Sequence, residues 1–239
     1  MNRKALLALC IAILLPIVSY LLVKHYSDGA VVMPARIYMD SVITKITDGK
    51  ETTDTVWHKV EDITLTNQLG TQVSLSDLKN KVIVADFFFT KCPSICPRLT
   101  RNMKKLQDAL KIKDELRNID TSFIQFISFT VDPERDSATV LKKYGDRFGV
   151  NPEIWWLLTG PKKTIYDFAI NELKLGLTDG GTVDSNFIHT SKFVLLDKDR
   201  VVRGYYDGLD SIALSKLAGD LIFIMLEKEK KKKRNLFRK

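Results

Sequence analysis

Cysteine and histidine are scarce in this sequence, with three of each among 239 residues. The cysteines are Cys10, Cys92 and Cys96, and the first of them lies inside an apolar N-terminal stretch. The two that remain are too few for a four-thiolate zinc or iron–sulfur site. A metal site in this chain would therefore have to combine two sulfurs with a different kind of donor.

A broad basic surface is also lacking, although the formal net charge is +8. Residues 227–239 hold eight Lys or Arg and two Glu, a net of +6, which leaves about +2 for the rest of the chain. A nucleic-acid-binding domain carries its positive charge as a patch or stripe across the fold, so we exclude that class of partner. We expect the basic tail itself, from Lys228, to be a solvated, disordered extension, with contact to anionic lipid as the alternative.

One long hydrophobic run is present, over residues 5–23. It is uncharged, follows Arg3 and Lys4, and ends before Lys24. A helix needs about 20 apolar residues to cross a bilayer, and a basic flank at its start favours a cytoplasmic N-terminus. We predict that residues 1–25 form a single-pass anchor in the cytoplasmic (inner) membrane, with the remaining chain on the periplasmic or extracytoplasmic side.

Two other interpretations of the N-terminus are a cleaved signal peptide and a lipoprotein leader. A signal peptide usually has a shorter apolar core and a small-x-small cleavage site, which residues 27–30 match poorly. A lipid-bearing cysteine is expected after a small residue, whereas Leu9 precedes Cys10. We therefore expect Cys10 to be an inert thiol.

The chain after the anchor divides into a spacer, a domain and the basic tail. Residues 26–59 form the spacer, in which residues 36–47 and 50–56 suggest a hairpin with a turn at Asp48-Gly49. Globular structure begins near residue 60 with a short hairpin and a helical turn, and the domain extends over residues 60–226. The tail, residues 227–239, follows it.

Strand and helix patterns alternate through the domain. Continuous apolar runs predict buried strands, and apolar residues spaced three or four apart predict helices. Strands are expected at residues 81–90, 122–131, 154–158, 192–197 and 201–206, and helices at 99–110, 137–148, 162–173 and 210–226. A βαβαβ series followed by ββα predicts an α/β domain with a thioredoxin-like fold, in which helices flank a mixed central sheet. Trp155 and Trp156 are expected to be core residues of one strand.

The two cysteines of the domain lie where the strand at residues 81–90 ends and a helix begins. Backbone N–H groups and the helix dipole stabilise a thiolate at that position, as does Lys91. Cys92 and Cys96 stand one helical turn apart, with Cβ atoms about 5–6 Å from each other. A disulfide needs a Cβ separation of about 3.5–4.5 Å, so this spacing favours metal binding without excluding redox cycling.

Copper is the metal that best suits two thiolates and a nitrogen ligand. The nitrogen must come from His25, His58 or His189. His189 is the best placed, because it precedes the strand at residues 192–197, and that loop faces the helix start in a thioredoxin-like sheet. The predicted ligands are therefore Cys92, Cys96 and His189.

Three motifs in this order resemble the SCO/SenC family of copper proteins. They are Phe-x-x-Cys-Pro-x-x-Cys-Pro at residues 89–97, Val-Asp-Pro-Glu-Arg-Asp at 131–136, and Ile-His-Thr-Ser at 188–191 followed by Leu195 and Asp197. The resemblance covers about residues 60–226. It implies that Cys92, Cys96 and His189 bind Cu(I) or Cu(II), and that the client is the dinuclear copper site of cytochrome c oxidase subunit II.

The resemblance also has limits. Many members carry Asp where this chain has Ser94, which leaves the three ligands intact but changes the local charge. The family places an acidic residue near the site, which here would be Asp132 or Asp136. The sequence supports equally a purely structural interpretation, in which Asp132-Pro133 ends a strand and Asp136 or Ser137 caps the next helix. Neither carboxylate is therefore counted as a ligand.

Two main functions remain open from the sequence, and a third, a copper-independent signalling or scaffold role, would make no use of the cysteines. The first is a metallochaperone that passes copper to an acceptor. The second is an enzyme, a membrane-anchored thiol–disulfide oxidoreductase acting on client cysteines, in which Cys92 attacks and Cys96 resolves.

Overall fold

The computed structural model describes residues 3–27, 32–47, 50–117, 123–175 and 190–236, and it divides into two units between Pro34 and Ala35. The first unit contains α1 (Arg3–Ser27), a helix with Pro16 inside it. Its large apolar side chains between Ile11 and Val23 are exposed. Among the helices that the structure describes, none is both long enough and apolar enough to cross a bilayer. The predicted transmembrane anchor is therefore not confirmed.

The second unit begins with a two-stranded antiparallel hairpin, formed by β1 (Met39–Thr47) and β2 (Lys50–Trp57). Thr47 pairs with Lys50, while the expected turn at Asp48-Gly49 lies outside the described residues. After the hairpin, His58 donates its backbone N–H to Tyr38, and Val60 donates to Arg200 in the main domain.

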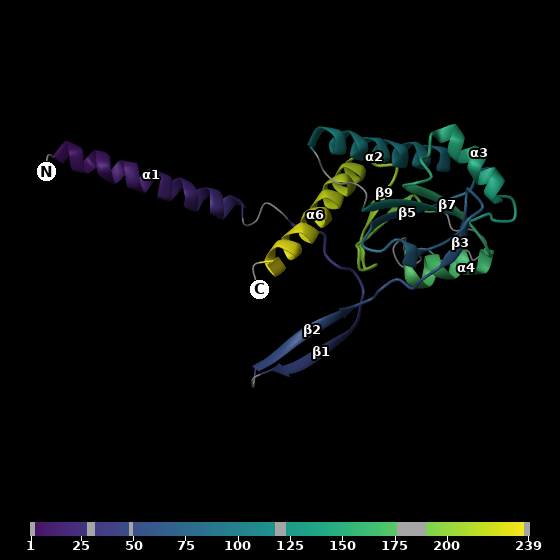
Figure 1. Cartoon of the computed structure of the whole chain (residues 1–239), viewed down its shortest axis with the longest axis horizontal. Helices are drawn as coiled ribbons and strands as arrows, with labels where there is room; N and C mark the ends of the chain where they lie inside the picture. The colour runs from purple at the N-terminus through teal and green to yellow at the C-terminus, as the bar shows by residue number, and fades with distance from the viewer. Residues whose placement is uncertain (1–2, 28–31, 48–49, 118–122, 176–189, 237–239) are drawn as a thin grey trace. The chain divides into compact units, whose positions relative to one another are not determined.

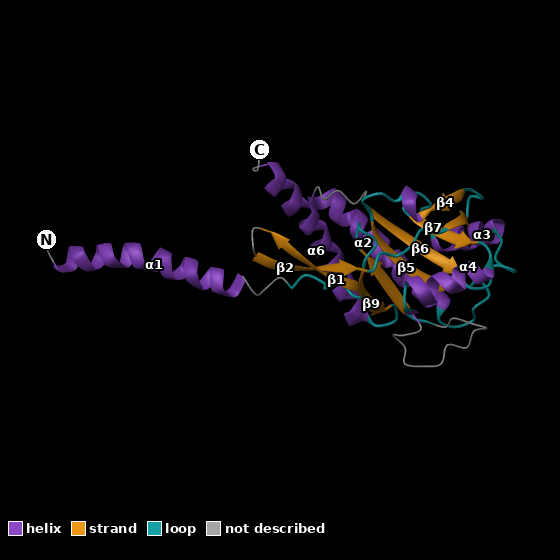
Figure 2. Ribbon diagram, turned by 90° about the horizontal axis from the view of Figure 1, so that it is seen from below, coloured by secondary structure: helices purple, strands orange, loops and turns teal. Residues whose placement is uncertain are grey.

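A mixed sheet forms the centre of the domain, in the order β4-β3-β7-β6-β5-β8-β9. Three parallel strands lie in its middle, and antiparallel strands complete both sides. The strands are β3 (Thr64–Asn67), β4 (Gln72–Ser74), β5 (Val82–Phe88), β6 (Ile124–Thr130), β7 (Trp155–Thr159), β8 (Lys192–Leu196) and β9 (Val202–Asp207). This is the predicted thioredoxin-like arrangement of a mixed sheet between helices (Figures 1 and 2).

Helices cover both faces of this sheet, and they belong to two separate apolar clusters. Side chains of α2, α3 and α6 pack in the first cluster, whereas α4, η1 and η2 contribute to the second. Their bounds are η1 (Leu75–Asp77), α2 (Cys96–Arg117), α3 (Ala138–Phe148), α4 (Lys162–Asp167), η2 (Phe168–Glu172) and α6 (Ser211–Leu236).

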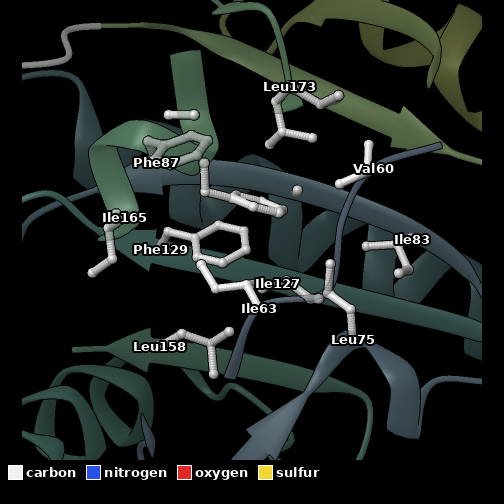
Figure 3. Close-up of a cluster of buried hydrophobic side chains, with 14 of the residues drawn as sticks. Val60, Ile63, Leu75, Ile83, Phe87, Ile127, Phe129, Leu158, Ile165 and Leu173 are labelled. Carbon is white, nitrogen blue, oxygen red and sulfur yellow. The ribbon is translucent and has the colours of Figure 1, made fainter. Parts of the chain in front are cut away.

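The central strand β5 contributes to both clusters because its side chains alternate between the two faces. Val82, Val84 and Phe88 join the first cluster, and Ile83 and Phe87 join the second. Figure 3 shows the second cluster, where Phe87 lies near Phe129, with ring centroids 5.2 Å apart in a stacked arrangement. All seven residues of β5 are buried, which confirms the prediction of a strand covered on both faces.

Three helices differ from their predicted form. The helix expected over residues 99–110 is α2, which runs over Cys96–Arg117. The segment expected as one helix over residues 162–173 is α4 followed by the wider π-type turn η2, which lets both Phe168 and Ala169 reach the core. The last helix, α6, continues to Leu236, so the expectation of a disordered tail is wrong over residues 228–236. Lys and Glu favour helix, and residues 227–236 contain neither Gly nor Pro.

Both tryptophans occupy strand β7 as expected. Trp155 is fully buried, and its indole Nε1–H donates to Ser128 Oγ at 2.9 Å. Trp156 is partly buried and packs on the opposite cluster. They are core residues of the described structure.

The role of the second cluster can be tested at Ile127, which is wholly buried on β6. Ile127→Ala removes buried methyl groups and leaves a cavity, so we expect the free energy of unfolding to fall by about 2–5 kcal/mol. Denaturant unfolding of the purified protein measures this loss. Ile212→Ala, at a position that is 78% exposed, is the matched control and should stay within about 0.5 kcal/mol of wild type. Equal effects of the two changes would contradict the assigned core.

Candidate metal centre

The cysteine pair lies at the junction between β5 and α2. The chain turns after Phe88, and Cys92 donates its backbone N–H to the carbonyl of Phe89 at 3.2 Å. Ile95 O then accepts the N–H groups of Arg98 and Leu99, which closes the first turn of α2. Pro97 stands in that first turn, where a missing N–H breaks no helical hydrogen bond. The sequence therefore ends the strand and starts the helix within a few residues of both sulfurs.

Both thiols of the pair are reduced and buried, at 8% exposure for Cys92 and 3% for Cys96. The backbone N–H of Cys96 points at Cys92 Sγ from 3.5 Å. A sulfur that accepts N–H groups at a helix start is stabilised as a thiolate. The structure thus places one sulfur of the pair where negative charge is favoured.

The two thiols differ in acidity. Burial raises the pKa of Cys92, but the Cys96 side chain and the backbone N–H groups of Cys96, Ser94 and Ile95 outweigh it, and the pKa is lowered overall. Burial raises the pKa of Cys96 to about 12, and the Cys92 side chain and the charges of Cys92 and Asp86 add to the effect. Cys92 is therefore the more easily ionised sulfur, and a metal that binds both must displace the proton of Cys96.

Asp136 fixes the segment that leads into the pair. Its buried carboxylate accepts the backbone N–H of Thr90 at 3.0 Å, the hydroxyl of Thr90, and the hydroxyl of Thr130 at 2.5 Å. These bonds connect the chain just before Cys92 to the end of β6. Ser137 occupies the N-cap position of α3 but makes no capping hydrogen bond with its side chain. Asp136 is thus a positioning residue for the cysteine loop.

Asp132 has the structural role that its sequence position suggested. Its carbonyl accepts the N–H groups of Arg135 and Asp136, which forms a turn, and its side chain pairs with Arg135 Nε at 2.9 Å.

Asp86 is a site residue that the sequence reasoning missed. It lies on β5, on the same face as Val84 and Phe88, and is 1% exposed. Burial raises its pKa to about 7, despite the opposing hydrogen bond with Ser128. Its Oδ1 has no hydrogen-bond partner among the described residues. The available signal was a single carboxylate inside an otherwise apolar strand.

The structure describes the three histidines to different extents. His189 lies outside the described residues, and only the backbone of His25 is described. His58 is engaged elsewhere, with Nδ1 3.1 Å from Asp40 and Nε2 3.4 Å from Glu172. In the described part of the chain, no group of three or more His, Cys, Asp or Glu side chains is arranged to hold a metal.

The direction of β8 relative to β5 shows toward which end of β5 the strand β8 begins. This matters because the predicted third ligand, His189, precedes β8 in the sequence. β8 runs antiparallel to β5, with Val194 opposite Ala85 and Leu196 opposite Ile83. The start of β8 therefore lies toward the end of β5 that leads to the cysteines. Thr190, two residues before β8, is buried and accepts the backbone N–H of Lys192 through its hydroxyl.

A dithiol at a strand–helix junction of a thioredoxin-like sheet defines a class of proteins that use cysteine for metal binding or thiol exchange. Comparison with known proteins narrows the class. The family model SCO1/SenC matches residues 51–220. The SCO1 protein homolog of Bacillus subtilis (strain 168) is 35% identical over 174 residues, covering 72% of this chain and 86% of the relative. This chain belongs to the SCO1/SenC family.

Solved structures agree with this assignment. A SCO1/SenC family lipoprotein from Bacillus anthracis str. Ames aligns with a TM-score of 0.59 and 32% identity, over 70% of this chain and 95% of that one. BsSco, described as a cytochrome c oxidase assembly protein with a disulfide switch, aligns at 0.58 and 34%, over 71% and 94%. ScoI of Bradyrhizobium japonicum, solved with copper bound, shares the fold at 0.52 and 24%, over 68% and 97%.

Asp86 gives a testable pH dependence of stability. Its pKa is raised from the usual 3.8 to about 7, so the folded state holds the proton more tightly than the unfolded state. This contribution is complete below pH 3.8 and is lost as pH rises through about 7. We expect Asp86→Asn to remove that decline and to stabilise the copper-free protein at pH 8 by up to about 4 kcal/mol.

Denaturant unfolding across this pH range, with reductant and chelator present, measures the difference between wild type and Asp86→Asn. Asp167→Asn is the control, because Asp167 belongs to an exposed ion pair with Lys163 that contributes little to stability. A wild-type protein and an Asp86→Asn variant with parallel pH profiles would contradict the assignment.

Proposed function

We propose that this protein is a copper metallochaperone, which holds copper through Cys92, Cys96 and His189 and delivers it to the dinuclear copper site of cytochrome c oxidase subunit II. The observation that carries the proposal is the position of two sulfurs at the start of α2, where backbone N–H groups already favour a thiolate at Cys92. The descriptions of BsSco as an oxidase assembly protein and of ScoI as copper-bound support it.

The donor set explains the choice of metal. Thiolates are soft ligands that select Cu(I), and an imidazole extends the site to Cu(II). A sulfur from the loop before α2, a sulfur from the first residue of α2 and a nitrogen from a distant loop would make a three-coordinate site. Such a site leaves one side open, through which an acceptor can take the metal by exchanging ligands one at a time.

A thiol–disulfide exchange role is the second candidate, and the acidity difference within the pair favours it. Cys92 has the lowered pKa of an attacking thiol, whereas Cys96 keeps its proton. In this role Cys92 would attack a client disulfide and Cys96 would resolve the mixed disulfide. Both roles use the same two sulfurs, so copper binding and thiol exchange need separate measurements.

The ligand set can be tested by copper titration of the reduced full chain. We expect one copper per chain, and a loss of affinity beyond about 100-fold for Cys92→Ser or Cys96→Ser, because loss of an outer partner alone costs about 10–100-fold. His189→Ala should abolish the Cu(II) charge-transfer colour and weaken Cu(I) binding. His58→Ala is the matched control and should bind as wild type, because His58 is engaged with Asp40 and Glu172.

Two results would count against this proposal. Unchanged stoichiometry and spectra in His189→Ala would remove that residue from the site. Rapid turnover of a model disulfide by the copper-free protein, lost in Cys92→Ser and combined with no copper binding by wild type, would instead support the exchange role.

We also infer that residues 5–23 attach the protein to the cytoplasmic membrane as a single-pass segment, with the domain on the extracytoplasmic side. The support is the uncharged run between Lys4 and Lys24, together with the exposed apolar side chains on all sides of α1. The Bacillus anthracis relative is described as a lipoprotein, which is another form of membrane attachment.

Membrane attachment predicts that alkaline carbonate will not extract the full chain from membranes, and that protease added outside spheroplasts will degrade the domain. Leu14→Arg combined with Val18→Arg places two charges in the segment, each unfavourable by about 2.5–3.5 kcal/mol near a bilayer centre. This variant should become extractable. An N-terminus missing from the mature protein, or a lipid on Cys10, would replace the single-pass model with a cleaved signal or a lipid anchor.

A further inference from the structure

A groove of about 650 Å³ opens beside the cysteine pair, between α2 and α3. Cys92 lies in its wall, and the aromatic rings of Tyr144 and Phe148 form an apolar part of the lining. No Asp or Glu is found among the described residues that line it. Any molecule that reaches the Cys92 sulfur from this side must pass along the groove.

Three guanidinium groups give the groove its charge. Arg98 and Arg101 lie three residues apart on α2, and Arg147 enters from α3. All three side chains are exposed, and within the described parts of the chain none of them has a carboxylate partner. Arg147 also lies 5.9 Å from the ring centroid of Phe148.

In the described part of the chain, two lysines on the same helices form ion pairs, unlike the three arginines. Lys104 pairs with Asp108 on α2, and Lys142 pairs with Asp146 on α3, both at 2.5 Å. Each helix therefore neutralises some of its lysine charge internally, while the three groove arginines form no ion pair within the described ranges of the chain. Arginine presents a planar fork of N–H donors that matches a carboxylate in a bidentate manner.

The arginines and the aromatic rings together indicate which class of molecule this groove can bind. Positive charge on two walls, with no acidic group between them, attracts a chain of carboxylates and speeds its approach. The two aromatic rings add an apolar surface that a small inorganic anion could not use. A groove of about 650 Å³ with arginines on both α2 and α3 has room for a peptide segment that carries more than one acidic side chain.

We propose that this groove docks an acidic peptide segment of the protein that exchanges copper with Cys92. This inference rests on the proposed function, because it assigns a partner to the same site. The arginines hold the acidic segment, and the segment's own metal ligands then lie beside Cys92 in the wall of the groove.

The direct test measures binding of a short fluorescent peptide of alternating Asp, Glu and Gly to the copper-free, reduced full chain. We expect the peptide to bind, its Asn and Gln counterpart not to bind, and the affinity to fall as salt increases. Arg98→Gln combined with Arg147→Gln should weaken binding by at least about tenfold, the loss expected for removing charge-assisted hydrogen bonds.

The matched control is Lys105→Gln combined with Lys143→Gln, which makes the same change in net charge on the same two helices at exposed positions outside the groove. This control should weaken peptide binding much less than the arginine double variant, because Lys105 and Lys143 do not line the groove and an ammonium lacks the planar fork that binds a carboxylate in a bidentate manner. Equal weakening in both double variants, no binding by wild type, or complete displacement by inorganic phosphate at matched ionic strength would overturn the docking assignment.

Copper titration of the same proteins separates this inference from the proposed function. The Arg98 and Arg147 double variant should load copper as wild type does, but transfer it more slowly to an acidic acceptor. Failure of wild type to bind copper would refute the proposed function and leave the peptide result in place. Normal copper loading without any peptide binding would refute the docking assignment alone.

Discussion

The site depends on the backbone N–H groups that converge on the sulfur of Cys92 at the start of α2. The N–H groups converge where β5, which is buried on both faces, ends a few residues before the helix begins. Asp136 hydrogen-bonds both Thr90 and Thr130, the last residue of β6. These bonds hold the loop between β5 and α2 near the start of α2. A strand, a helix and one buried carboxylate are thus enough to hold a sulfur in a polar environment inside an apolar domain.

The two sulfurs lie four residues apart but do not share a helical turn as expected, because α2 begins at Cys96 and Cys92 lies in the loop before it. Their environments also differ. Cys92 stands at the groove and is stabilised as a thiolate, whereas Cys96 faces the core, close enough to Asp86 for that charge to raise its pKa. Cys92 is therefore the sulfur that a metal or a client contacts from the groove, and Cys96 is the sulfur on the core side of the site. This division suits stepwise ligand exchange, and it equally suits a disulfide that forms and reopens.

Much of the fold could be predicted from the sequence, because buried strands and amphipathic helices leave strong periodic patterns. The run at residues 82–88 and the cysteine pair after it are examples. Asp86 could not be assigned, since a lone carboxylate in a strand does not reveal which face it occupies or how close it lies to Cys96. The role of Asp136 was equally hidden, because its partner Thr90 lies 46 residues away in the sequence. The length of α6 was underestimated because charge was taken to outweigh helix propensity in the tail. The position of His189 remains a prediction.

The central claim is that two sulfurs and one imidazole bind a single copper ion. X-ray absorption of the copper-loaded full chain tests it most directly. The account predicts two sulfur scatterers in both oxidation states, and an imidazole nitrogen that is present in wild type and absent in His189→Ala. A first shell of nitrogen and oxygen only, or one that His189→Ala leaves unchanged, would contradict it.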